Sequence, residues 1–257
     1  MSRIPSVVII GSGKVASHLG EALKNRNIQI LQVVGHTKLS ASKLAKKLIC
    51  AYTIDYDKIN KEADFYIVSV KDDTIASVVE KIEFQPNMII HTSGSVGCEI
   101  FQNKFKNYGV LYPLQTFSEG RKINFEKIPL LIEANKKENL KKLEKFSLRL
   151  SKVIYPVDSE KRKAIHVAAV FVCNFVNHMY NIGANILERE GIPFEILIPL
   201  IAETADKVQH GKPKNLQTGP ALRNDQRVIK SHLHYLNDLE LKKIYALLSK
   251  SIYKYAQ

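Results

Sequence analysis

The stretch VVIIGSGKVA, residues 7–16, decides the fold, because a run of β-branched residues leads directly into two glycines two positions apart. A strand, a glycine turn and a helix in this order open a dinucleotide-binding unit with the pattern G-x-G-x-x-A. In this interpretation Gly11 permits the tight turn, Gly13 lets the backbone approach a pyrophosphate, and Ala16 lets the helix pack against the strand. An ordinary turn that uses two glycines is the alternative.

The amides at the start of this helix would face the anion, helped by the helix dipole. We therefore expect the cofactor phosphates to lie on Gly11, Ser12, Gly13, Lys14, Val15 and Ala16.

The end of the second expected strand, residues 28–34, carries the signal for the type of cofactor. An NAD site usually has Asp or Glu there, about 20 residues past the glycines, to hold the ribose 2′-hydroxyl. No acid occurs between Glu21 and Asp55. Hydroxyls and cations favour a 2′-phosphate instead, and the sequence supplies His36, Thr37 and Lys38, followed by Ser40 and Lys43. We predict NADP(H) over NAD(H), with lysines scattered by composition alone as the alternative.

Length and composition describe an ordinary soluble globular protein: 257 residues, 45% hydrophobic and 25% charged. A formal net charge of +13 raises the possibility of nucleic acid. However, the lysines are scattered and no aromatic-basic RNA signature occurs, so we expect no nucleic-acid partner. A basic surface that helps to capture an anionic cofactor is the preferred interpretation.

The three cysteines show no paired spacing, which favours a reducing cytoplasm and no structural metal. We find no secretion signal and no apolar run of membrane-spanning length, so we expect no membrane partner.

Strands and helices alternate up to residue 157, and helices alone follow. The strand over residues 63–70 is continuously apolar, which is typical of a parallel sheet covered on both faces. We predict an α/β fold with a Rossmann dinucleotide-binding domain over residues 1–157 and an all-helical domain for substrate binding and dimerisation over 158–257. The other expected elements are helices 42–49, 75–82, 136–150, 161–190, 194–209, 220–236 and 239–255, and strands 87–92, 109–112, 129–132 and 152–156.

Polar side chains recur at helical spacing along the long helix: His166, Asn174, Asn177, Asn181 and Asn185. The helix is otherwise apolar, which predicts burial, and buried polar groups need partners. The polar residues therefore either bond to neighbouring helices, the preferred interpretation for the last two, or line a wet cleft. We predict catalytic roles for His166, as a proton donor or acceptor, and for Asn174, as a ligand of the polarised oxygen or nitrogen.

Loops at the carboxyl edge of the predicted sheet supply further candidates, because ligands of such folds bind there. We expect Val70 and Lys71 to pass beside the cofactor, and Asp72 and Asp73 to cap the following helix. In the segment HTSGS, residues 91–95, we assign Thr92 to the cofactor and Ser93 to the substrate, with a plain turn as the alternative.

Two more loops complete the predicted substrate site. Gln115 lies in YPLQT, residues 112–116, which would wall the cleft. In TGPALRND, residues 218–225, we assign Arg223 and Asp225 to the substrate, because an arginine offers a planar fork for a carboxylate or phosphate. A surface pair between these two residues is the alternative, with Thr218 capping a helix that Pro220 starts.

The chain resembles, over essentially its whole length, the Rossmann-like proteins with a C-terminal domain of unknown function 2520. The segments that carry the resemblance are GSGKVA, HTSGS, LYPLQTF, HVAAVFVCNF and TGPALRND. The relatives of that family are pyrroline-5-carboxylate reductase, the β-hydroxyacid dehydrogenases and the deazaflavin-dependent NADP oxidoreductases. The resemblance implies an NADP-type cofactor, a dimerising helical domain like that of 6-phosphogluconate dehydrogenase, and a reductase or dehydrogenase site between domains.

One departure from these relatives matters. The β-hydroxyacid dehydrogenases place a catalytic lysine four residues before an asparagine, where this chain has Val170. We predict an NADP-dependent oxidoreductase acting on a small anionic carbonyl, imine or hydroxyacid, with His166 partly replacing that lysine. The alternative is an NADP-binding sensor or scaffold without turnover, which the missing lysine favours.

Overall fold

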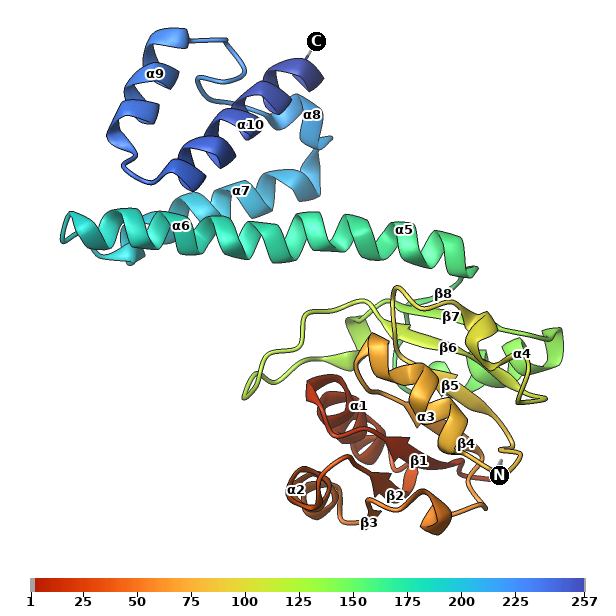
Figure 1. Ribbon diagram of the computed structural model, residues 1–257. Helices are drawn as coiled ribbons and strands as arrows, with labels where there is room; N and C mark the ends of the chain where they lie inside the picture. Colours follow the sequence, from red (N-terminus) through yellow and green to blue (C-terminus); the bar gives the residue numbers. More distant parts are fainter. Residues whose placement is uncertain (1–2, 257) are drawn as a thin grey trace. The chain divides into compact units, whose positions relative to one another are not determined.

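The structure, a computed structural model, describes residues 3–256. It divides into two compact units, Met1–His178 and Met179–Gln257, each of which is described by itself (Figure 1). The first unit is an α/β domain and the second consists of helices, as the sequence predicts. The domain boundary between residues 157 and 158 stays a prediction.

The first unit contains an eight-stranded sheet in the order β3-β2-β1-β4-β5-β6-β7-β8. All neighbouring strands are parallel except β6 and β7, an antiparallel pair that the sequence did not predict. The order 3-2-1-4-5 in the first half is that of a doubly wound dinucleotide fold, in which ligands bind at the carboxyl ends of the strands. The strands are β1 (Ser6–Ile10), β2 (Gln29–Val34), β3 (Ala51–Thr53), β4 (Phe65–Val68), β5 (Ile89–His91), β6 (Tyr108–Pro113), β7 (Leu130–Ala134) and β8 (Ile154–Pro156).

The helices of the first unit cover both faces of this sheet. They are α1 (Lys14–Asn25), α2 (Lys38–Leu48), α3 (Ile75–Lys81), α4 (Lys137–Ser147) and α5 (Ser159–Ala169). Helix α5 continues through a π-helical segment, η5 (Val170–Phe175), into α6 (Val176–Arg189).

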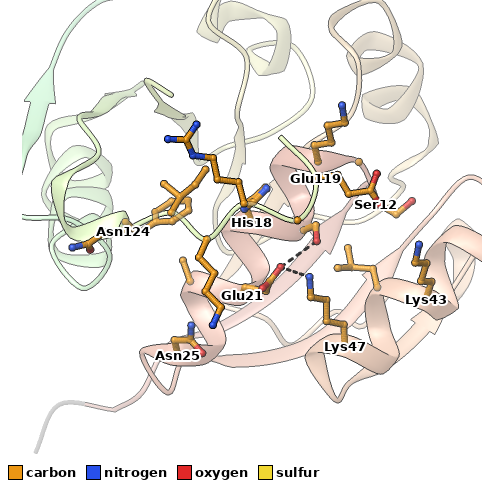
Figure 2. A pocket seen from close by; sticks show the side chains of 18 of the residues that line it. Ser12, His18, Glu21, Asn25, Lys43, Lys47, Glu119 and Asn124 are labelled. Carbon is orange, nitrogen blue, oxygen red and sulfur yellow. Dashed lines mark hydrogen bonds and ion pairs between the residues drawn. The ribbon is translucent and has the colours of Figure 1, made fainter. Parts of the chain in front are cut away.

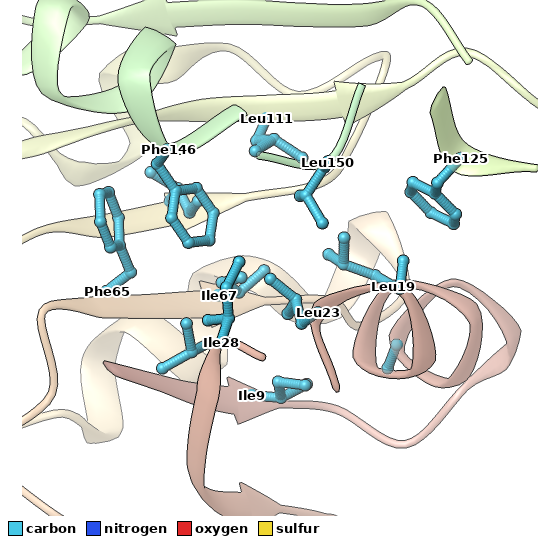
Figure 3. Close-up of a cluster of buried hydrophobic side chains, with 14 of the residues drawn as sticks. Ile9, Leu19, Leu23, Ile28, Phe65, Ile67, Leu111, Phe125, Phe146 and Leu150 are labelled. Atoms are coloured by element: carbon cyan, nitrogen blue, oxygen red, sulfur yellow. The ribbon is translucent and has the colours of Figure 1, made fainter. Parts of the chain in front are cut away.

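Alternate side chains of β1 enter two separate cores, because successive strand residues point to opposite faces. Val7 and Ile9 belong to a core with α1, α2 and α4, and Val8 and Ile10 to a core with α3. Figure 3 shows the first core, in which the rings of Phe65 and Phe146 stack with their centroids 4.2 Å apart. Burial on both faces confirms what the continuous apolar strands predict.

Capping interactions explain where helices of the first unit differ from the expectation. Helix α2 begins at Lys38 rather than residue 42, because the hydroxyl of Thr37 accepts a hydrogen bond from the Ser40 amide at 3.3 Å and caps it. The predicted capping role of Asp72 and Asp73 is wrong. Residues 72–74 form a 3₁₀ turn, and the carboxylate of Asp73 accepts from the Thr74 hydroxyl at 3.0 Å instead.

The second unit contains α7 (Ile198–His210), α8 (Pro213–Leu216), α9 (Gln226–Tyr235) and α10 (Leu239–Ala256). The predicted helix from Pro220 begins instead at Gln226, because Asp225 caps it by accepting from the Val228 amide at 3.2 Å. Thr218 therefore caps no helix there, and the short helix α8 lies before it. Asp238 caps α10, since its carboxylate accepts from the amides of residues 240 and 241.

The predicted burial of the long helix is wrong within a single chain. In α5 the buried residue is Arg162, and none is buried in η5 or α6. The side chains of Phe171 and Val172 are 62% and 68% exposed. The long helix has the apolar side chains that the sequence predicts, but nothing in the first unit covers those of α5 and η5. Within residues 3–256, no helix combines the length and the apolar character needed to cross a membrane.

Candidate functional site

The glycine turn is held between two strand ends. Gly11 has a φ of +123°, and its amide donates to the carbonyl of Val34, 2.7 Å away. A Cβ at Gly11 would lie 2.1 Å from the carbonyl oxygen of Ser69, directly after β4. Only glycine can make this approach, for both steric and conformational reasons.

Gly13 is a glycine that the fold itself does not require. It has an ordinary extended conformation, and a Cβ there would meet no protein atom within 4 Å. The space beside it is open at the first turn of α1, which contains no acidic residue. Ala16 is fully buried beneath that turn, while Lys14 is exposed and Val15 half-buried. Free helix amides beside open space form a site suited to an anion.

Three hydroxyls, which we call the hydroxyl cluster, join the glycine turn to the start of α2. The hydroxyl of Ser12 donates to that of Ser40 at 3.0 Å, and the Ser40 hydroxyl lies 2.8 Å from that of Thr37. His36, Thr37 and Lys38 are exposed, and the first turn of α2 also lacks acids. Two helix N-termini and three hydroxyls therefore lie together without a negative charge among them.

A second loop leads from the glycine turn toward His166. The hydroxyl of Thr92 donates to the hydroxyl of Ser69 at 3.2 Å. Two residues on, a Cβ at Gly94 would lie 2.7 Å from Nδ1 of His166 and 2.9 Å from the ring of Tyr112. Strands β1, β4 and β5 are neighbours, so the glycine turn, Ser69 and this loop follow one another along the same sheet edge.

Tyr112 and His166 form the titratable pair at this edge, with the tyrosine oxygen 2.9 Å from Nδ1 of the histidine. Burial raises the pKa of the Tyr112 hydroxyl, and the charges of Asp72 and Cys173 act in the same direction. The hydroxyl therefore stays protonated at neutral pH and is able to donate to Nδ1. In the neutral tautomer that accepts this hydrogen bond, His166 carries its hydrogen on Nε2, where it can be given to a ligand.

A buried ion pair holds the start of α5 and thereby the position of His166. Arg162 is 1% exposed, and its guanidinium contacts the carboxylate of Glu133 on β7. The same guanidinium donates to the carbonyl of Val96 at 2.6 Å. The hydroxyl of Ser159 donates to Glu133 at 2.8 Å. These contacts fix the first helical turns to the sheet and to the loop after β5, one turn before His166.

The buried His91 has a structural role. Burial, followed by the charge of Arg162, lowers its pKa to about 4, so it is neutral at physiological pH. Its Nδ1 accepts from the amide of Ser93 at 3.2 Å, and Nε2 lies 3.4 Å from the carbonyl of Gly97. His91 thus shapes the loop that carries Ser93. The Ser93 hydroxyl itself accepts from the amides of residues 95 and 96.

The exposed Asn174 lies within the π-helical segment η5, eight residues after His166. Eight residues amount to about two α-helical turns plus one residue. Because a π turn takes up one residue more than an α turn, we expect η5 to bring Asn174 back to the helix face of His166. Such segments occur frequently at functional sites.

Three of the remaining predicted residues, Gln115, Lys71 and Arg223, are exposed. Gln115 is exposed, and its side-chain carbonyl accepts from the Thr116 amide at 2.8 Å. Val70 packs beside Gly11, and Lys71 is exposed. Arg223 and Asp225 belong to the second unit, where no ion pair joins them and Asp225 caps α9. Across residues 3–256, no cluster of three or more His, Cys, Asp or Glu side chains is arranged to hold a metal ion.

Three contributors to the site were not predicted from the sequence. Tyr112 was expected in a cleft wall without a chemical role, and Arg162 and Glu133 were not singled out. A signal for Arg162 was its place as the one arginine in a run of lysines, residues 161–163, since buried ion pairs favour arginine. No local pattern could identify the partner of Tyr112, which is 54 residues away in the chain.

A cavity of about 850 Å³ lies beside the glycine turn (Figure 2). Its walls come from the first residues of α1, the facing sides of α1 and α2, and the loop over residues 119–125. Of the residues expected at the cofactor it shares Ser12, Gly13, Lys14, Ser40 and Lys43, and neither Tyr112 nor His166 lines it.

Family models cover most of the chain. A Rossmann-like domain matches residues 2–115, and a domain of unknown function (DUF2520) matches residues 128–252. The chain belongs to the Rossmann-like proteins with this C-terminal domain. The resemblance found in the sequence is therefore confirmed. No protein of curated function matches the chain.

Solved structures of similar fold cover the chain almost completely. A Bacteroides fragilis protein, provisionally named an NADP oxidoreductase, is 41% identical with a TM-score of 0.92 over 97% of this chain and 98% of that one. An imine reductase from Myxococcus stipitatus in complex with NADP⁺ is 17% identical, with a TM-score of 0.68 over 97% and 92% of the two chains. A 1-pyrroline-5-carboxylate reductase from Streptococcus pyogenes is 14% identical, with a TM-score of 0.66 over 98% of both chains. The last two show the shared fold.

Replacing Arg162 with methionine should destabilise the first unit by about 3–5 kcal/mol, because it leaves the Glu133 carboxylate without its buried partner. Lys161→Met is the matched control, since Lys161 is exposed and pairs with Asp158 at the surface. Its effect should stay within about 1 kcal/mol. Urea denaturation measures both. Equal stability of the two variants would show that the buried pair does not anchor α5.

Proposed function

We propose that the protein is an NADP-dependent oxidoreductase that acts on a small anionic carbonyl, imine or hydroxyacid. The observation that carries this proposal is the arrangement along one sheet edge. An anion-binding turn at Gly11 and a proton-donating pair, Tyr112 and His166, are connected by the loop after β5. An oxidoreductase needs both parts, since a hydride transfer to a carbonyl or imine carbon is completed by a proton. The name of the 41% identical Bacteroides fragilis protein supports the same class.

The residues present fit a phosphorylated dinucleotide. The amides of residues 11–16 would hold its pyrophosphate, because Gly13 leaves open space there and no acid opposes the charge. The hydroxyl cluster with His36 and Lys38 would hold a 2′-phosphate, which favours NADP over NAD. Val70, Lys71 and Thr92 would border the rest of the cofactor along the sheet edge. When bound, the cofactor supplies or accepts the hydride.

His166 would give or take the proton through Nε2. Tyr112 acts on it as a positioning residue, because a hydroxyl that donates to Nδ1 fixes both the ring orientation and the tautomer. The amide of Asn174 would hold the polarised oxygen or nitrogen of the substrate. Ser93, Gln115, Arg223 and Asp225 remain proposed substrate ligands.

The exposed apolar face of α5 and η5 supports a homodimer through the helical region. Val167, Phe171, Val172 and Phe175 are each about half or more exposed, and contiguous apolar surface of this kind usually marks an interface. A monomer in sedimentation at micromolar concentration would contradict this part of the proposal. The three free cysteines agree with a cytoplasmic location, which cell fractionation tests.

The cofactor proposal predicts a specific effect of Gly13→Asn. Asparagine is a good helix N-cap, and the open space accommodates it, so the free energy of unfolding should stay the same or rise. Its side chain would occupy the amides that the pyrophosphate needs, so NADPH affinity should fall by at least about 100-fold. Fluorescence titration with NADPH and urea denaturation measure the two effects. Unchanged affinity in this variant would remove the proposal.

The preference for NADP is tested at Thr37. Asp and Asn both cap a helix well, so Thr37→Asp and Thr37→Asn should each preserve α2. Only the aspartate adds a negative charge beside the expected 2′-phosphate. We expect Thr37→Asp to lower the ratio of NADPH to NADH affinity by about tenfold or more, and Thr37→Asn to leave it within about threefold. Equal ratios in the two variants would contradict a phosphate at this position.

Turnover is tested with cyclic imines and keto acids as NADPH oxidants. His166→Gln should lower kcat by about 10²–10⁴ while NADPH affinity is unchanged, because it removes the proton donor but not the glycine turn. Tyr112→Phe should cause a smaller loss, and His178→Gln, an exposed histidine on the same helix, should have no effect. Tight NADPH binding by the wild type without turnover of any oxidant would favour the sensor alternative.

A further inference from the structure

We propose that residues 114–124, which we call the strap, hold the phosphates of the bound dinucleotide through Arg121 and Lys122 and slow its release. This inference rests on the proposed function and deepens it. It assigns to the cofactor a segment that belongs neither to the glycine turn nor to the start of α2, and that follows β6 in the other half of the sheet.

The connection that contains the strap is much longer than its two strands require. Strands β6 and β7 are antiparallel neighbours that pair up to Pro113 and Leu130, and two residues suffice to join such a pair. Here residues 114–129 separate them, and the regular structure among these residues is the short 3₁₀ turn η4 (Phe125–Lys127). Connections of this length are uncommon in compact domains and usually have a function of their own.

The strap reaches the cavity beside the glycine turn, which we call the basic cavity. Residues 119–124 line one part of it, and Gly13 and Ser40, both expected at the cofactor, line another. Figure 2 shows Glu119 of the strap and Ser12 of the glycine turn on this same cavity. A phosphate bound at the glycine turn therefore has the strap as its neighbour across the cavity.

Positive charge on the wall of the basic cavity exceeds negative charge. Clefts lined by one sign of charge concentrate ions of the opposite sign. The charged side chains of the lining are the cations Lys14, Arg26, Lys43, Lys47, Arg121 and Lys122 and the acids Glu21 and Glu119.

The two cations of the strap are available to an anion in this cavity. Arg121 and Lys122 are both exposed, and neither forms an ion pair with any residue in the described range 3–256. By contrast, Lys47 on α2 is already paired with Glu21 on α1 (Figure 2). Arginine and lysine side chains form strong, charge-assisted hydrogen bonds with phosphate oxygens.

The strap is fixed to α1, the helix that begins at the glycine turn. Nε2 of His18 on this helix lies 3.0 Å from the carbonyl oxygen of Ser118, which is 100 residues away in the chain. The His18 ring also packs on Phe117, with the centroids 5.2 Å apart, and Phe117 stacks on Phe125 directly after the strap. These contacts hold the strap on either side of the exposed residues 118–122, which therefore stay beside the cavity.

Release of NADPH from the full-length protein, followed by stopped-flow fluorescence, tests the strap. We expect Arg121→Ala/Lys122→Ala to raise the dissociation rate by at least about tenfold, because contacts made with a bound ligand act mainly on dissociation. Lys136→Ala/Lys137→Ala is the matched control, because it removes the same charge from exposed positions at the start of α4. The control should change the dissociation rate by less than about twofold.

Trypsin provides a second measurement, since it cleaves after arginine and lysine and the strap is exposed. Saturating NADPH should slow cleavage of the wild type after Arg121 and Lys122 by at least about tenfold, because the bound phosphates hold the strap. Cleavage after Lys61, which is exposed in the segment before β4, should change by less than about twofold. Mass spectrometry identifies the sites.

The outcomes separate the strap from the cofactor proposal. If the wild type binds NADPH but the strap variant releases it at the wild-type rate, the strap is overturned and the cofactor proposal stands. A loss confined to the association rate, or an equal effect of the control, would show general surface attraction and also overturn the strap. Unchanged cleavage after Arg121 and Lys122 would do the same. A wild type that binds no NADPH would overturn both proposals.

Discussion

The buried contact between Arg162 and Glu133 is the constraint on which the candidate site depends. An arginine in the interior is tolerated because the carboxylate on β7, the carbonyl of Val96 and the hydroxyl of Ser159 accept hydrogen bonds from its two terminal nitrogens. Since these groups come from different elements, the contact ties the start of the long helix to the sheet edge at one place. The position of His166 beside Gly94 and Tyr112 follows from it, one helical turn later.

The distribution of charge separates two regions along the sheet edge. The first turns of α1 and α2 lack acids, and the hydroxyl cluster lies between them, so this region accepts negative charge without competition. At the other end of the same edge, burial keeps Tyr112 protonated and His91 neutral. Anion binding and proton transfer therefore occupy separate parts of one edge. The basic cavity extends the positive region away from the expected hydride-transfer site.

The sequence predicted what depends on local signals. Residues 7–16 identified the glycine turn, and the continuous apolar strands identified a sheet buried on both faces. The predicted start of α9 at residue 220 was wrong, because proline is as compatible with a turn as with the first turn of a helix. The helix begins after Asp225 instead, because the Asp225 carboxylate caps it. The pairs Tyr112–His166 and Glu133–Arg162 could not be predicted, since their members lie 54 and 29 residues apart and meet only after the sheet has formed.

The central claim is that a dinucleotide bound at the glycine turn lies along the sheet edge with its reactive ring at His166. A crystal structure of the protein with NADP⁺ tests this most directly. The account predicts the pyrophosphate on the amides of Gly13 and Lys14, the 2′-phosphate at the hydroxyl cluster, and the nicotinamide ring in contact with the His166 side chain. A nicotinamide ring placed away from His166, or a dinucleotide bound wholly within the basic cavity, would contradict it.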